Sequence, residues 1–236
     1  MDILAFDTCF DACSASVARS RDGGVEVLAS ALERFETGHA ERLVPMIDEI
    51  MARAGTTFAD IGRLAVTIGP GTFTGTRIGI AAARGLALAT GIAVVGASSL
   101  AVMAEVAVRE LGERKVDEDF LVTVDARRGE VYAQLFGGNG RDARSSPLLL
   151  PVEEAAQLGH SGSLRAVGSG AAAVVEAATR AGRRGAARLA DLVPEATALA
   201  ALAIGLAPLD VPVAPLYLRP ADAKPQDGKS IARAPR

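Results

Sequence analysis

The hydrophobic and polar positions predict strands at the start of the chain and a helix after residue 38. Three short, mostly apolar runs separated by turn-forming residues predict an antiparallel meander of strands, at residues 2–7, 13–18 and 25–33. From His39 onward, apolar residues recur at helical spacing, and Gly55 is a natural stop for that helix. The first part of the chain therefore predicts a three-stranded meander followed by an amphipathic helix.

Strands and helices then alternate up to about residue 111. The pattern predicts strands at 63–68 and 92–96, and helices at about 76–90 and 98–111. Ser98 or Ser99 is suited to cap the second of these helices. A glycine-rich loop, residues 69–75, joins the first strand to its helix. Alternation of this kind is typical of parallel strands joined by crossover helices.

The second half of the chain resembles the first. The apolar run 120–125 ends in Asp125, as the run 2–7 ends in Asp7, and a tight turn follows each. We interpret this as an internal duplication. Later elements are helices at 152–158, 171–181 and 196–207, a strand at 164–167 and an extended segment at 208–219. The predicted fold class is α/β in two lobes, residues 1–112 and a smaller lobe at 113–220, with a disordered tail at 221–236.

Composition narrows the class of protein. The 236 residues are 50% hydrophobic and 22% charged, with a net charge of −3, so no overall basic field attracts nucleic acid. Cys9 and Cys13 do not make a disulfide framework, and we expect two buried thiols. The sequence shows no signal peptide, no membrane-spanning run and no metal-ligand spacing of histidines. We therefore expect a cytoplasmic protein that binds neither membrane nor metal.

Two segments are candidates for phosphate chemistry. Asp7 and Thr8 stand at the end of a strand, with Asp125 as their counterpart, and suit either Mg²⁺-bound phosphate or an ordinary turn. The glycine-rich loop precedes a helix start, where backbone N–H groups favour an anion. A sharp turn that needs glycine explains the same loop equally well. The loop residues concerned are Gly69, Gly71, Thr74 and Gly75.

The helix after this loop carries small residues four positions apart, at Gly75 and Gly79 and again at Ala81, Gly85 and Ala89. Small residues allow another helix to approach closely, and each glycine inside a helix costs about 1 kcal/mol relative to alanine. The pattern therefore indicates close packing, either within the chain or against a partner.

Four segments resemble the TsaB (YeaZ) family. They are Gly38–Pro45, Ile68–Gly79, Val124–Tyr132 and Pro215–Ala223, of which the Gly-Pro-Gly-Thr-Phe-Thr-Gly stretch is the most specific. The resemblance runs through about residues 1–223. It implies two RNase-H-like lobes of the actin/Hsp70/sugar-kinase (ASKHA) superfamily. It also implies an accessory subunit of the complex that adds threonylcarbamoyl to adenosine 37 of ANN-decoding tRNAs.

The resemblance further implies partners. These are the catalytic subunit TsaD, the ATPase TsaE, tRNA through the complex, and a second copy when the chain is alone. It implies no intrinsic cofactor, with ATP or ADP and Mg²⁺ at the level of the complex. TsaD carries two metal-binding histidines where Ser99 and Met103 stand here, which implies that this chain is not an enzyme. The implied interface with a partner comprises Leu43, Met46, Ile47, Ile50, Met51, Arg77, Ile80, Ala81, Arg84 and Leu88.

Two alternatives stay open. The acid-ended strand of each half allows a free-standing Mg-ATP-binding protein of ATPase or kinase type that uses Asp7 and Asp125. Arginine pairs at 127–128 and 183–184 allow a stand-alone tRNA-binding protein. The negative net charge of the chain makes this alternative less favourable, because the tRNA backbone is also negatively charged.

Overall fold

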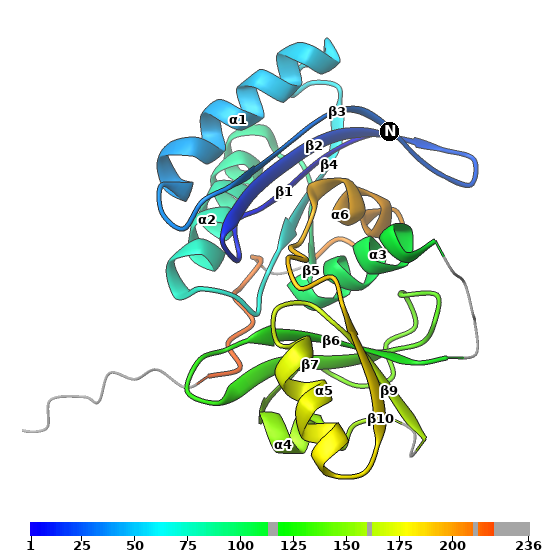
Figure 1. The fold of residues 1–236 in the computed structure, drawn as a ribbon. Coiled ribbons are helices and arrows are strands. Elements are labelled where there is room, and N and C mark those ends of the chain that lie inside the picture. The colour runs from blue at the N-terminus through cyan, green and yellow to red at the C-terminus, as the bar shows by residue number, and fades with distance from the viewer. Residues whose placement is uncertain (113–117, 160–161, 210–211, 220–236) are drawn as a thin grey trace, which may run out of the picture.

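A computed structural model describes residues 1–112, 118–159, 162–209 and 212–219. The first of its two five-stranded sheets is built on a central strand that pairs antiparallel on one side and parallel on the other (Figure 1). Its strand order is β3 (Gly24–Arg34), β2 (Ala12–Arg21), β1 (Asp2–Asp7), β4 (Ile61–Thr67) and β5 (Val94–Ala97). The predicted meander and parallel crossovers are confirmed.

The second sheet repeats this arrangement. Its order is β8 (Leu148–Pro151), β7 (Glu130–Phe136), β6 (Phe120–Asp125), β9 (Ser163–Val167) and β10 (Arg184–Arg188). Strand β6 pairs antiparallel with β7 and parallel with β9, as β1 pairs with β2 and β4. Both halves thus have the same topology, which confirms the internal duplication and the α/β class with two RNase-H-like sheets.

Helices cover both faces of the first sheet because the side chains of β1 alternate. Leu4 and Phe6 point toward α1 (His39–Ala54) and α2 (Phe73–Thr90), which pack together on one face. Ile3 and Ala5 point to the other face, toward α3 (Ser99–Leu111) and α6 (Ala196–Ala203).

Helix α3 also joins the two sheets. Its Leu100 and Met103 pack against Phe120, Val122 and neighbouring residues of the second sheet. The opposite face of that sheet is covered by α4 (Val152–Ala155) and α5 (Ala171–Arg180). In Figure 1, α3 lies between the two sheets, so one apolar layer is common to both halves.

The structure differs from the predicted lobe at 113–220 near its end. Helix α6 packs on the first sheet, and Leu209 N and Leu216 N donate to carbonyl oxygens of Val94 and Ile68. A helix of alanine and leucine is apolar on every side, so its pattern does not show which sheet it covers. The predicted tail at 221–236 lies outside the described residues.

Several boundaries also differ. Helix α2 begins at Phe73 rather than near 76, because the Thr72 side chain accepts a hydrogen bond from Gly75 N and caps it there. The helix predicted at 152–158 is one short turn, and strands β8 and β10 were not predicted. Strand β10 is exposed along its length and has no apolar alternation. None of the described helices has the length and apolar character needed to cross a membrane.

Candidate functional site

Asp7 ends the central strand of the first sheet and is completely buried. Its carboxylate accepts hydrogen bonds from the Thr67 hydroxyl and from the Cys9 N–H, the latter at 3.3 Å. Burial raises the pKa of this carboxyl from 3.8 to about 6 because a charge is poorly solvated there. Asp7 therefore lies inside the protein and has no surface with which to meet a ligand in solvent.

The glycine-rich loop packs on the turn that follows Asp7. Thr72 N donates to the Cys9 carbonyl at 2.7 Å. The Thr8 hydroxyl donates to the Gly75 carbonyl at 2.7 Å and accepts from Gly79 N at 3.0 Å. These bonds tie the loop and the start of α2 directly to the turn after β1.

Glycine is required in this loop because two backbones meet. A Cβ atom on Gly71 would collide with the Cys9 carbonyl oxygen, and one on Gly75 with the Thr8 carbonyl oxygen. The turn interpretation of the loop is therefore supported, because Gly71 and Gly75 allow close backbone packing and the N–H groups of Thr72 and Gly75 donate to protein atoms.

The predicted phosphate-loop residues do not form an open anion site. Asp125 is exposed at the end of β6, where it accepts a hydrogen bond from Arg127 N at 2.8 Å. In the first lobe only Thr74 is exposed and Gly71 half-buried, whereas the remaining members are buried: Asp7, Thr8, Gly69 and Gly75. These residues do not fit Mg-ATP, because Asp7, the acid that would face the metal, is completely buried.

Both cysteines are free and buried, as predicted. The Cys9 thiol lies 3.3 Å from the Thr67 hydroxyl, and burial beside Asp7 raises its pKa well above the usual range. Cys13 packs near the Met46 sulfur, and burial raises its pKa to about 12. Neither thiol is placed to act as a nucleophile or ligand.

Six of the ten predicted interface residues belong to the core of the chain itself. Their exposed fractions are 0–6%, and they pack against the first sheet: Leu43, Met46, Ile47, Ile50, Met51 and Ile80. This part of the prediction is wrong, because α1 has one apolar face and that face covers the sheet. The substitutions Ile47→Arg and Gly79→Leu therefore cannot test an interface. The first would disrupt the core, and the second would place a side chain against the Thr8 hydroxyl.

The other four predicted interface residues are exposed on α2. Two of them hold the C-terminal segment against the helix: Arg77 donates to the Tyr217 hydroxyl at 2.6 Å, and Arg84 donates to the Val213 carbonyl at 2.8 Å. Ala81 is exposed between them, and Leu88 is 90% exposed.

The outer face of α2 therefore carries a stripe with no covering element among the described residues. No atom of the described residues lies within 4 Å of the place where a Cβ would stand on Gly85, so no contact within that part of the chain explains this glycine. Its neighbours on the stripe are Ala81, Leu88 and Ala89, all exposed. In Figure 1, α2 lies beside α1 at the edge of the first lobe, and Val44 of α1 is 57% exposed.

Ser99 and Met103 are both fully buried in α3. The Ser99 hydroxyl donates to the Pro70 carbonyl, and Met103 packs between the two sheets. Both side chains are engaged in packing. Among the residues that the structure describes, no three histidine, cysteine, aspartate or glutamate side chains are grouped as metal ligands.

Comparisons with known proteins match this chain to proteins of tRNA threonylcarbamoyladenosine biosynthesis. Residues 33–187 match the family model described as TsaD, tRNA N6-adenosine threonylcarbamoyltransferase. The tRNA threonylcarbamoyladenosine biosynthesis protein TsaB of Escherichia coli is 44% identical over 132 residues, or 56% of this chain and 53% of that protein. The chain thus matches about half the length of this curated relative. An uncharacterised Mycobacterium tuberculosis protein is 33% identical over 94% of both chains.

Solved structures support the same relationship over nearly the whole chain. YeaZ from Pseudomonas aeruginosa is 30% identical, with a TM-score of 0.74, and the match covers 92% of this chain and 99% of that one. A second structure from that organism, described as an uncharacterised protein with similarity to peptidase YeaZ, is 31% identical with a TM-score of 0.75.

Proposed function

Because this chain belongs to the TsaB (YeaZ) family, we propose that it is a non-catalytic accessory subunit in tRNA threonylcarbamoyladenosine biosynthesis. In this role it binds a TsaD-type catalytic subunit through a helical bundle, and works with the ATPase TsaE in the complex that adds threonylcarbamoyl to adenosine 37 of ANN-decoding tRNAs. The tRNA is bound through the complex. This role implies a cytoplasmic protein.

The observation that carries the proposal is the exposed stripe on α2. A leucine that is 90% exposed loses favourable burial unless a partner covers it, and the space at Gly85 allows a partner helix to approach closely. Val44 is a second exposed apolar side chain, on the neighbouring helix α1. A standard interface buries about 1,600 Å² in total, which two helices on each side can supply. The same face supports a homodimer when the catalytic subunit is absent.

Two features support an accessory rather than a catalytic role. Ser99 and Met103, at the positions where TsaD has metal-binding histidines, are packed in the core. Asp7 is completely buried, so its carboxylate has no access to solvent. ATP or ADP with Mg²⁺ then belongs to the complex rather than to this chain alone.

The test is a Leu88→Arg substitution, measured as binding to the TsaD homologue of the same organism. Because Leu88 is almost fully exposed, the monomer should keep its fold and melting temperature. A buried hot-spot residue contributes at least ~2 kcal/mol to binding, so affinity should fall by at least about thirty-fold. Modification of tRNA by the reconstituted complex should fall in parallel.

Val27→Arg is the matched control. Val27 is 43% exposed on β3, away from α2, so this variant adds the same charge without touching the stripe and should bind normally. If Leu88→Arg binds as well as the wild type, the α2 face is not the interface. If the wild type forms no complex even with nucleotide and tRNA present, the pairing with TsaD is wrong.

A further inference from the structure

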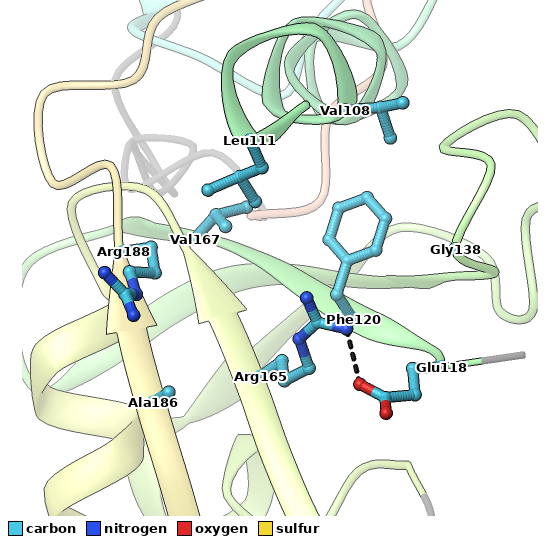
Figure 2. A pocket seen from close by; sticks show the side chains of 9 residues that line it. All are labelled: Val108, Leu111, Glu118, Phe120, Gly138, Arg165, Val167, Ala186 and Arg188. Atoms are coloured by element: carbon cyan, nitrogen blue, oxygen red, sulfur yellow. Dashed lines mark hydrogen bonds and ion pairs between the residues drawn. The ribbon is translucent and has the colours of Figure 1, made fainter. Parts of the chain in front are cut away.

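A cavity of about 270 Å³ lies between the last turn of α3 and the inner face of the second sheet (Figure 2). Its floor is apolar, formed by Leu111 of α3, Phe120 of β6, Val167 of β9 and Ala186 of β10. It is separate from the α2 face and from the enclosed Asp7. The cavity belongs to no function described above.

Charged side chains stand over this floor. Arg165 and Arg188 lie on the neighbouring parallel strands β9 and β10, and the register that pairs Arg165 with Ala186 puts both arginines on the cavity side of the sheet. Figure 2 shows both guanidinium groups on this side, with Glu118 beside Arg165. Two cations and one carboxylate give the cavity a net positive charge.

The arginines differ in what they already bind. Arg165 Nη1 lies 2.6 Å from Glu118 Oε2, so that guanidinium is oriented by an ion pair and keeps its other N–H donors. Arg188 makes no ion pair or side-chain hydrogen bond with any residue in the described ranges. An exposed guanidinium with free donors, next to a second one held in place, suits a planar or tetrahedral anionic group.

We propose that this cavity binds a small organic anion. Its carboxylate or phosphate group accepts hydrogen bonds from Arg188 and Arg165, and its apolar or aromatic body packs on Phe120 and Leu111. The apolar floor is what distinguishes this ligand from an inorganic ion, because an inorganic ion would leave that surface in contact with water.

Calorimetric titration of the full chain with phenyl phosphate and with benzoate tests this. At least one of the two should bind, and the stronger identifies the preferred anionic group. Inorganic phosphate lacks the aromatic body and benzyl alcohol lacks the charge, so each should bind at least ten-fold more weakly. Arg188→Gln should weaken binding of the preferred anion by about ten-fold, since it removes charge-assisted hydrogen bonds.

Arg184→Gln is the matched control. Arg184 lies on the same strand and the same side but pairs with Ser163, further from the cavity, and it does not line it. This variant should bind the anion as the wild type does. Three results would each overturn the proposal. They are equal losses of binding in Arg184→Gln and Arg188→Gln, equal binding of inorganic phosphate and phenyl phosphate, and no binding of either aromatic anion. Arg184 and Arg188 are both exposed, so neither substitution should unfold the protein. A melting curve of each variant checks this.

Discussion

Gly75→Ala is expected to destabilise the protein by more than about 3 kcal/mol, the largest effect that we predict. The added Cβ would collide with the Thr8 carbonyl oxygen and lie 2.6 Å from the Thr72 hydroxyl that caps α2. Because the obstacle is backbone, relief requires the loop to separate from the turn after β1. That movement would break the hydrogen bonds between the loop and Thr8. The measurement is the free energy of unfolding from denaturant titration.

Gly85→Ala is the control for the same substitution in the same helix. None of the atoms that the structure describes lies within 4 Å of the Cβ position at Gly85, so the added methyl group meets no obstacle there. Alanine also restricts the unfolded chain, and the variant should be about 0.5–1 kcal/mol more stable than the wild type. Equal effects at the two positions would show that the loop does not pack on Thr8 as described.

Asp7→Asn is expected to change how stability depends on pH. The folded-state pKa of Asp7 is raised from 3.8 to about 6. At a pH between these two values, the folded protein keeps a proton on Asp7 that the unfolded chain has released. Stability from this group therefore falls as pH rises between about 4 and 6. Asparagine does not titrate. The free energy of unfolding of the Asp7→Asn variant, relative to that of the wild type, should therefore rise by roughly 2 kcal/mol from pH 4 to pH 7.

Asp2→Asn provides a control of opposite sign on the same strand. The Arg19 side chain, 2.7 Å from the Asp2 carboxylate, lowers the pKa of Asp2. This group stabilises the fold at neutral pH and loses that contribution as pH falls through its folded-state pKa, so Asp2→Asn should lose stability relative to the wild type as pH rises. Chemical denaturation at several pH values measures both variants. A flat difference for Asp7→Asn would mean that Asp7 is not enclosed.

Enclosure of Asp7 bears on how this fold is used. In each half an aspartate ends the central strand, but the surroundings of the two differ. Around Asp7 the loop after β4 folds back onto the turn, whereas Asp125 is exposed. The first turn therefore serves the stability of the lobe. The surfaces that we propose for recognition lie elsewhere, on the outer face of α2 and in the cavity beneath α3.

The sequence by itself determined much of the local structure and the family. Short apolar runs separated by turn residues specified the meander, and the repeated strand ending in aspartate specified the duplication. Gly55 and Ser98 marked helix ends where the structure has them. These features depend on residues close to one another in the chain, so short segments of the sequence are enough to predict them. The Gly-Pro-Gly-Thr-Phe-Thr-Gly segment pointed to the family for the same reason.

Only the tertiary structure decided which surfaces are buried. Periodicity shows that α1 has an apolar face, but a sheet and a partner helix favour the same residues, and the structure assigns Ile47 to the core and Leu88 to the surface. The anion cavity combines α3, β9 and β10, which are far apart in sequence. Burial and cavity shape arise from contacts between distant segments, and no local pattern encodes how those segments meet.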